Sequence, residues 1–453
     1  MSTPDPGSFR DPASHVVLDG DKVIRLLDER GLEGWRALSD SEFFRTAVAE
    51  GRLIAAVELA DAPEPSTAAL EHPRLPFISY PYEWTFSMLK DAALLQLDLL
   101  EKALAAGLTI KDATPYNIQF VDGRPMFIDI GSFEPYRAGE PWIGYRQFTR
   151  QFLFPLLLRA WVGVPFQPWL RGDLEGLTPA QMARLLPFRK RFNTSALLHV
   201  RLQARMESRM ADRAVRKDLS EAGFTADLIL ANVKRLRALI QSLDWENVED
   251  GWSTYVECSH VTRDRSAKAE FLTSAVRKYG PSRVIDLGAN DGHFSQVAAE
   301  SGALAIAVDG DEPVLDVLYR RSAGTGMAIV VGDLANLSPA QGWAGEERSS
   351  LIDRARPDLV IAYGVIHHLI YGASIPPREV LRWLAGFGCP VILEFVSPAD
   401  EMVAKLIGNK LPHELHGGGE EQEFRSLLDE MFVTSAEQRL TSGTRVLFAL
   451  EPR

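Results

Sequence analysis

The feature that most constrains the fold is a regular alternation of short apolar runs and helical stretches in the C-terminal part of the chain. From residue 280 onward the apolar runs are, in order, RVIDLG, ALAIAVDG, AIVVGDL, PDLVIAYG and PVILEFVSP. Strands that alternate with helices predict a parallel sheet with crossover helices. Two last runs, FVTSAEQRL and TRVLFALE, add an antiparallel hairpin at the edge. The pattern predicts a doubly wound, Rossmann-like α/β fold with a seven-stranded sheet.

A glycine-containing turn, DLGANDG, follows the first of these strands. Gly288 and Gly292 flank Asn290 in this turn. Glycine lets the backbone approach a ligand closely, and the N–H groups at the start of the next helix favour negative charge. The turn alone is compatible with either a dinucleotide or S-adenosylmethionine.

Three acidic residues lie at the ends of the first three strands, and they distinguish between these two possible ligands. Asp286 precedes the first glycine, where a carboxylate repels a pyrophosphate but attracts an ammonium group. Asp309 ends the second run and can accept hydrogen bonds from both ribose hydroxyls. Asp333 ends the third run and can accept from an adenine amino group while Leu334 packs on the ring. This arrangement favours a cationic amino-acid nucleoside.

The region from 251 to 453 resembles the class I S-adenosylmethionine-dependent methyltransferases. The motifs VIDLGANDG, AVDGD, VVGDLAN and PDLVIAYGVIHHL occur in the order and spacing of that family. The resemblance implies S-adenosyl-L-methionine as the cofactor, held by residues of the strand ends and the glycine turn, namely Asp286, Gly288, Asn290, Gly292, Asp309, Asp333, Leu334 and Tyr363. Asn290 replaces a common glycine, and its amide is expected to bond the turn or the methionine carboxylate.

The resemblance also places His367 and His368 beside the transferred methyl group. Neighbouring residues in a helical turn point in different directions, so at most one of the two faces the site. A histidine can act there as a general base near neutral pH, and a packing role for both is the alternative. The implied reaction is methyl transfer to an oxygen or nitrogen nucleophile of a small molecule or saccharide.

Further charged residues are candidates for the same site. Arg263 and Lys268 precede the glycine turn, and either can pair with the methionine carboxylate. Glu394 ends the fifth apolar run and is expected to line the cavity. Solvated helix charges are the alternative for the two cations.

The N-terminal stretch IKDATPYNIQFVDGRPMFIDIGSFEP raises a second possibility. Asp112, Asn117 and Asp129 follow the order in which kinase-like phosphotransferases place a base and two Mg²⁺ ligands. No glycine-rich phosphate loop precedes residue 80, so a degenerate kinase-like domain is favoured. An active phosphotransferase or an ATP-binding protein with an S-adenosylmethionine-sensing domain is one alternative, and an unrelated small domain is another.

The resulting domain plan has four parts: a flexible tail over 1–15, an α+β kinase-like domain over 16–135, a helical connector over 136–250 and a methyltransferase domain over 251–453. This plan resembles bacterial methyltransferases of the nodulation type, which suggests a saccharide or another small metabolite as the acceptor. Oligomeric state stays open.

Composition narrows the partners and the compartment. The formal net charge of −12 disfavours a large nucleic-acid footprint. Two distant cysteines, Cys258 and Cys389, form no metal-binding pattern and suit a reducing compartment. No signal peptide is expected at the N-terminus, and the most apolar segment, 152–166, is shorter than the roughly 20 residues that span a bilayer. A cytoplasmic protein without a transmembrane segment, structural zinc or a nucleic-acid partner is therefore expected.

Overall fold

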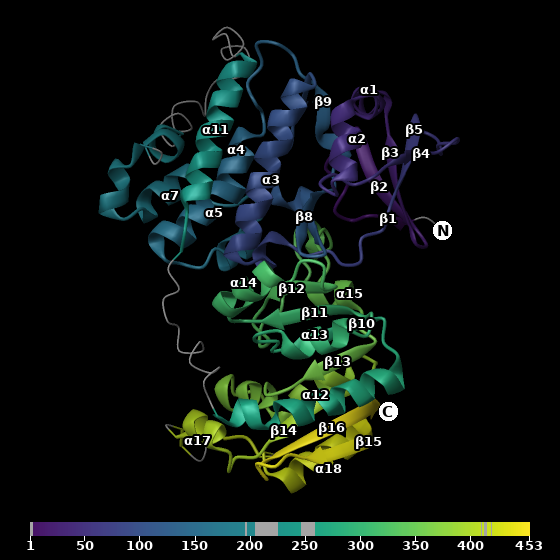
Figure 1. The fold of residues 1–453 in the computed structure, drawn as a ribbon, viewed down its shortest axis with the longest axis vertical. Coiled ribbons are helices and arrows are strands. Elements are labelled where there is room, and N and C mark those ends of the chain that lie inside the picture. Colours follow the sequence, from purple (N-terminus) through teal and green to yellow (C-terminus); the bar gives the residue numbers. More distant parts are fainter. Residues whose placement is uncertain are drawn as a thin grey trace. The chain divides into compact units, whose positions relative to one another are not determined.

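The computed structural model describes residues 3–194, 197–203, 225–245, 259–408, 410–411, 415–417 and 419–453. The chain forms two compact units (Figure 1): unit 1 comprises Met1–Glu246 and Ala340–Arg348, and unit 2 comprises Asn247–Pro339 and Ser349–Arg453. Parts of the predicted connector (136–250) and the start of the predicted methyltransferase domain (251–453) lie outside the described residues.

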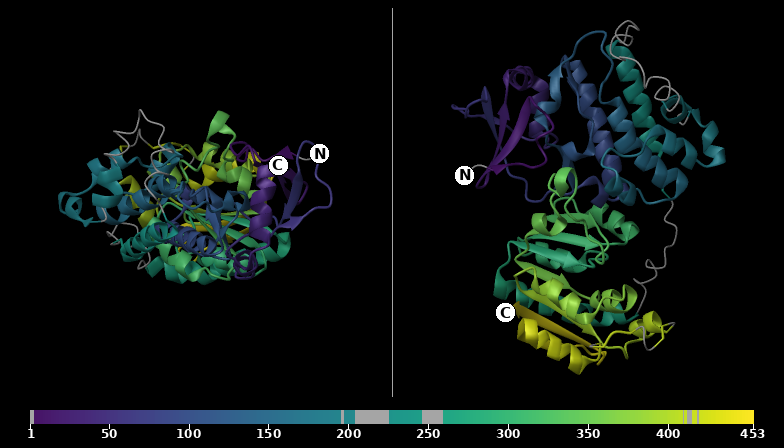
Figure 2. Two further views of the ribbon diagram at one scale, coloured as in Figure 1. Left: turned by 90° about the horizontal axis from the view of Figure 1, so that it is seen from above. Right: turned by 180° about the vertical axis from the view of Figure 1, so that it is seen from behind.

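Unit 2 is built on one seven-stranded sheet of order β12-β11-β10-β13-β14-β16-β15. Its strands are β10 (Arg283–Leu287), β11 (Leu304–Asp309), β12 (Met327–Val331), β13 (Leu359–Ala362), β14 (Val391–Val396), β15 (Phe432–Arg439) and β16 (Arg445–Pro452). The first five strands of this order run parallel, and β16 pairs antiparallel with both β14 and β15. The expectation of a doubly wound, mostly parallel sheet is confirmed. Figure 2 shows the green parallel strands continuing into the yellow hairpin at one edge.

In the described part of unit 2, seven α-helices connect and cover these strands: α12 (Ser259–Tyr279), α13 (His293–Ala299), α14 (Glu312–Arg321), α15 (Leu351–Ala355), α16 (Pro377–Ala385), α17 (Glu401–Ile407) and α18 (Glu421–Met431). From β10, the strands β11 and β12 are added on one side of the sheet, and β13 and β14 are added on the other side. The strand order therefore switches at β10. In such sheets, ligands bind outside the carboxyl ends of the strands at this switch point.

Unit 1 begins with a five-stranded antiparallel sheet of order β1-β2-β3-β5-β4. Its strands are β1 (Thr3–Pro4), β2 (Ser14–Asp19), β3 (Lys22–Leu27), β4 (Val57–Glu58) and β5 (Ala68–His72), and helices α1 (Glu29–Ser39) and α2 (Glu42–Ala49) follow β3. The flexible tail expected over 1–15 is corrected here, because Thr3 and Pro4 pair with Leu18 and Val17 of β2.

The remainder of unit 1 is organised around the buried helix α3 (Phe86–Ala105). Short strands follow it: β6 (Leu108–Ile110), β7 (Ile118–Val121), β8 (Arg124–Phe127) and β9 (Phe133–Pro135). Then come α4 (Tyr145–Phe148), α5 (Phe154–Leu157), α6 (Gln167–Gly172), α7 (Pro179–Leu185) and α11 (Ala226–Ser242). The Nζ of Lys90 on α3 donates to the carbonyl of Gln241 at the end of α11, at 3.1 Å. Among the described residues, no helix is both long and apolar enough to cross a membrane.

A short segment from the C-terminal half of the chain also belongs to unit 1. Residues Ala340–Arg348 follow β12 but pack with the N-terminal residues. The Nε of Arg10 donates to Glu347 at 2.7 Å, and the Arg348 guanidinium lies 4.5 Å from the centroid of the Tyr116 ring. The Arg10 hydrogen bond lowers the pKa of Glu347 to about 2. Unit 1 is therefore assembled from two separated stretches of sequence.

Candidate methyl-donor and acceptor site

The glycine turn between β10 and α13 has a left-handed backbone at three positions. The φ angles are +80° at Gly288, +47° at Asn290 and +73° at Gly292. A Cβ at Gly288 would lie 3.1 Å from Val365, and one at Gly292 would lie 2.5 Å from Leu318. Asparagine tolerates this backbone better than most side chains. The Oδ1 of Asn290 is buried without a hydrogen-bond partner among the described residues, so this oxygen is an acceptor suited to an ammonium group.

Asp286 lies in β10, just before the same turn. Its side chain is 1% exposed and accepts a hydrogen bond from the Ser295 hydroxyl at 2.6 Å. Burial raises the pKa of Asp286 to about 7, and the nearby Asp309 carboxylate adds to this while the Ser295 hydrogen bond opposes it. A cation close to Asp286 would stabilise its ionised form.

This pKa leads to an expected pH dependence of S-adenosylmethionine binding. Below pH 7 the Asp286 carboxyl of the free protein is largely protonated, and a bound ammonium group lowers its pKa. The dissociation constant should therefore fall as the pH rises from about 6 to 7.5, by at most roughly tenfold per pH unit. Titration calorimetry in two buffers of different ionisation enthalpy should show a proton released on binding. Asp286→Asn should abolish this release, and an unchanged release in that variant would contradict the assignment.

Asp309 shapes the turn from the end of β11. Its Oδ2 accepts from the backbone N–H of Asn290 at 2.8 Å, and its Oδ1 accepts from that of Asp311 at 2.9 Å. Each carboxylate oxygen has a second lone pair, so two acceptor positions remain for ribose hydroxyls. Asp309 can hold the turn and a ligand at the same time.

Asp333 and Leu334 follow β12, the neighbour of β11. The side chain of Asp333 is exposed and accepts from the backbone N–H of Ala335 at 2.9 Å, which caps the local turn. Leu334 is half-buried. Parallel strands bring their carboxyl ends to one edge, so the ends of β10, β11 and β12 with their three acids share that edge.

Tyr363 follows β13 and is 6% exposed. Its hydroxyl donates to the backbone carbonyl of Lys268 at 3.3 Å, and its ring meets that of Phe294 at 4.8 Å in an edge-on geometry. Burial raises the pKa of Tyr363 well above its usual range, so the hydroxyl stays neutral. The Tyr363 side chain therefore connects α12 to the edge of the sheet where the strands end.

His367 and His368 lie in the turn after β13, with ring centroids 4.2 Å apart. His367 is 1% exposed, and neither of its ring nitrogens has a hydrogen-bond partner among the described residues. Burial lowers the pKa of His367 well below its usual range, and it lowers the pKa of His368 to about 4. Both imidazoles are therefore neutral near pH 7, and the one unprotonated ring nitrogen of His367 can accept a proton.

A buried charge network lies across strands β14 and β16. Lys268 Nζ lies 2.7 Å from the carboxylate of Glu394, which is fully buried. Arg445 contacts Glu394 at 3.3 Å and Asp400 at 2.8 Å. Lys268, a candidate partner for the methionine carboxylate, forms an ion pair with Glu394. The side chain of Arg263, the other candidate, lies outside the described part of the chain.

The three residues of unit 1 for which the sequence predicted kinase-like roles also come together. The Asn117 amide lies 3.2 Å from the Asp129 carboxylate, and the Ser132 hydroxyl contacts both Asp129 and, at 3.5 Å, Asp112. Arg25 of β3 forms an ion pair with Asp129 at 2.8 Å. Burial, followed by the charge of Asp129, raises the pKa of Asp112 to about 6.

The geometry fits S-adenosyl-L-methionine. The turn leaves a buried amide oxygen without a partner, its two glycines are tightly packed, and acids with free acceptor positions lie at the strand ends. The chain is 34% identical over 462 residues to nodulation protein NoeA of Rhizobium meliloti (strain 1021), with 98% of this chain and 95% of the relative covered. The chain belongs to the NoeA family. The resemblance to nodulation-type proteins is thereby confirmed.

Three solved structures are among those to which parts of this chain are similar. Magnesium protoporphyrin IX methyltransferase from Synechocystis PCC 6803, with bound SAH, is 18% identical and covers 49% of this chain and 94% of its own, with a TM-score of 0.30. N-methyltransferase NodS from Bradyrhizobium japonicum WM9, with bound SAH, is 14% identical over 46% and 94%, with a TM-score of 0.32. The bifunctional kinase-methyltransferase WbdD is 20% identical over 47% and 45%, with a TM-score of 0.28. No family model matches the chain.

Unit 2 has the doubly wound, mostly parallel sheet that the sequence motifs predict, with the glycine turn after its first strand. Sequence reasoning missed Ser295, Asp400 and Arg445. No local pattern marks them, because Asp400 and Arg445 are 45 residues apart in the chain.

Proposed function

We propose that this protein transfers the methyl group of S-adenosylmethionine to an oxygen or nitrogen atom of a small molecule or saccharide. The observation that carries the proposal is His367, a buried and neutral imidazole at the start of the π-helix that follows β13, whose ring nitrogens have no hydrogen-bond partner among the described residues. We place the reaction in the cytoplasm, since the cysteine content suits a reducing compartment.

Different residues of unit 2 have different roles in such a reaction. Bound S-adenosylmethionine supplies an activated methyl group that the acceptor's lone pair displaces in line from sulfur. Asp286 and Asn290 orient the donor through its ammonium group, and Asp309 does so through the ribose. His367 takes the proton that the acceptor O–H or N–H loses as the new bond to carbon forms. Positioning of the two reactants supplies much of the acceleration.

Replacement of His367 by asparagine tests this proposal. Incubation of the wild type with isotopically labelled methyl donor and cell-extract metabolites should give S-adenosylhomocysteine and a labelled product by mass spectrometry. His367→Asn should lower the rate of product formation by a factor of about a hundred or more, because general-base catalysis contributes that much. Donor affinity should change less than threefold.

His368→Asn is the matched control and should retain most of the activity. Full activity of His367→Asn would remove His367 as the base. A wild type that binds no S-adenosylmethionine in calorimetry would remove the proposed function itself.

We further propose that residues 16–135 form a degenerate kinase-like domain, 136–250 a helical connector and 251–453 the methyltransferase domain. The convergence of Asp112, Asn117 and Asp129 supports the kinase-like interpretation. Arg25 argues against phosphotransfer, because its guanidinium neutralises the carboxylate that would bind Mg²⁺.

The expected result is that the wild type binds Mg²⁺–ATP with a dissociation constant weaker than about 1 mM. Arg25→Met should free Asp129 and allow Mn²⁺ to bind, which the paramagnetic broadening of water protons would report. Arg25→Lys, which keeps the cation, is the matched control and should bind no Mn²⁺. Tight Mg²⁺–ATP binding by the wild type would instead support the alternative, a phosphotransferase or ATP-binding protein with an S-adenosylmethionine-sensing domain.

A further inference from the structure

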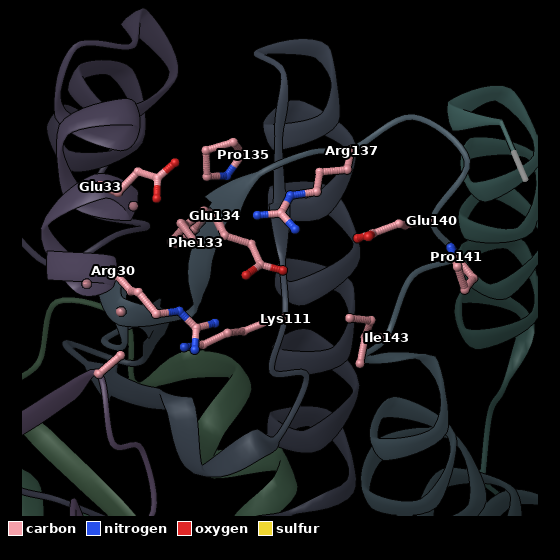
Figure 3. A pocket seen from close by; sticks show the side chains of 14 residues that line it. Arg30, Glu33, Lys111, Phe133, Glu134, Pro135, Arg137, Glu140, Pro141 and Ile143 are labelled. Carbon is pink, nitrogen blue, oxygen red and sulfur yellow. The ribbon is translucent and has the colours of Figure 1, made fainter. Parts of the chain in front are cut away.

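Unit 1 contains a cavity of about 520 Å³ that the methyl-transfer chemistry does not use (Figure 3). Its walls come from α1, from Lys111, and from β9 together with the segment that follows β9 as far as Ile143. Volumes between about 300 and 1,000 Å³ are typical of sites for small molecules. The cavity is therefore large enough for a ligand of one or two rings.

The walls of the cavity are held in place by close backbone packing. A Cβ at Gly34 of α1 would lie 2.7 Å from the carbonyl oxygen of Phe133 on β9. Phe133 itself is 2% exposed and anchors β9 in the core of unit 1. Because α1 and β9 are regular elements in direct contact, the side chains they carry into the cavity have defined positions.

Three cations from three separate elements point into this cavity: Arg30 of α1, Lys111 after β6 and Arg137 after β9 (Figure 3). Lys111 is bound to Asp11 at 3.0 Å. Arg30 and Arg137 form no ion pair within the described part of unit 1. Guanidinium groups that lack a carboxylate partner are well suited to bind the acidic group of a ligand in a bidentate manner.

Three carboxylates, Glu33, Glu134 and Glu140, line the same cavity and balance these cations. None of them forms an ion pair within the described residues. Cations and carboxylates in equal number favour a ligand that combines one acidic group with hydroxyl groups, because the hydroxyls can donate to the carboxylates. Pro135, Pro141 and the half-exposed Ile143 add an apolar surface on which a ring can rest.

We infer that this cavity is a binding site for a sugar that carries one acidic group, either a phosphate or a carboxylate. Arg30 and Arg137 bind the acidic group, and Glu33, Glu134 and Glu140 accept hydrogen bonds from the hydroxyls. The site lies wholly in unit 1 and is separate from the donor site of unit 2. It does not depend on methyl transfer by unit 2.

Ligand-observed NMR titration of the full chain tests the inference with four probes: glucose 6-phosphate, glucuronate, glucose and inorganic phosphate. At least one of the two acidic sugars should bind with a dissociation constant below about 1 mM, and whichever binds identifies the acidic group. Glucose and inorganic phosphate should bind at least tenfold more weakly. Equal binding of inorganic phosphate and the acidic sugars, or binding of none of the four, would overturn the inference.

Single variants sharpen the test. Arg30→Ala and Arg137→Ala should each weaken binding of the acidic sugar at least tenfold. Glu134→Ala should also weaken it at least threefold, because a hydroxyl acceptor is lost; at a site for a bare anion, the same change would strengthen binding. Arg36→Ala, at an exposed position of α1 outside the cavity, is the control and should have no effect. Retained S-adenosylmethionine binding verifies that each variant is folded.

Discussion

Replacement of Asp309 by alanine is expected to weaken S-adenosylmethionine binding at least a hundredfold, about 2.7 kcal/mol. The variant loses the acceptors for two ribose hydroxyls. It also removes the carboxylate that accepts from the backbone N–H groups of Asn290 and Asp311 at 2.8 and 2.9 Å, so the turn loses its support. Titration calorimetry with the wild type and the variant measures both dissociation constants, and circular dichroism verifies the fold.

Asn290→Gly is the comparison variant in the same turn, because it removes one acceptor for the ammonium group and leaves Asp309 in place. Glycine adopts the left-handed backbone of this position easily, so the loss of binding should stay within roughly tenfold, about 1.4 kcal/mol. A larger loss would show that the Asn290 side chain also supports the turn. Near wild-type affinity of Asp309→Ala would exclude Asp309 from the ribose site and leave it with a purely structural role.

Replacement of Glu394 by alanine should be the most destabilising single change in unit 2. Glu394 is fully buried, and the variant leaves the ammonium of Lys268, 12% exposed, without its carboxylate. Removal of one partner of a buried ion pair costs about 3–5 kcal/mol, because the other charge remains buried without compensation. Arg445 keeps its ion pair with Asp400, so the loss comes mainly from Lys268. Urea unfolding followed by circular dichroism measures the change in unfolding free energy.

Two controls make this result specific to the buried pair. The double variant Lys268→Met with Glu394→Leu removes both charges and should recover much of the loss, because apolar groups of similar size can replace a buried pair. Glu430→Ala breaks an ion pair with Arg378 on the surface and should leave the urea midpoint unchanged. Equal losses from Glu394→Ala and the double variant would contradict the assigned role of the buried charge.

Much of unit 2 could be predicted from sequence because local patterns specify it. Apolar runs of strand length predicted a mostly parallel sheet, and the glycines predicted a turn into a helix, which is the β10–α13 turn with positive φ angles at Gly288 and Gly292. Parallel strands align their carboxyl ends, so acids at the ends of successive runs could be assigned to one edge before the fold was known. The cofactor followed from this alignment.

Unit 1 was harder to predict because its contacts join distant parts of the chain. The stretch expected to be a tail supplies Arg10, which pairs with Glu347 more than 300 residues later. The Arg25–Asp129 pair joins a strand of the first sheet to the turn after β8. The cavity of unit 1 is formed in the same way, since Arg30, Lys111 and Arg137 meet only in the folded chain.

The sequence by itself determined the class of fold of unit 2 and the strand ends that carry its acidic residues, and it predicted the cofactor. Strand periodicity and turn chemistry depend on neighbours in the chain, and a sequence displays them directly. Only the tertiary structure decided the protonation states and the partners of these groups. Burial raises the pKa of Asp286 and lowers that of His367, and Glu394 forms an ion pair with Lys268. These properties depend on desolvation and on charges brought together through space, which no local pattern of residues encodes.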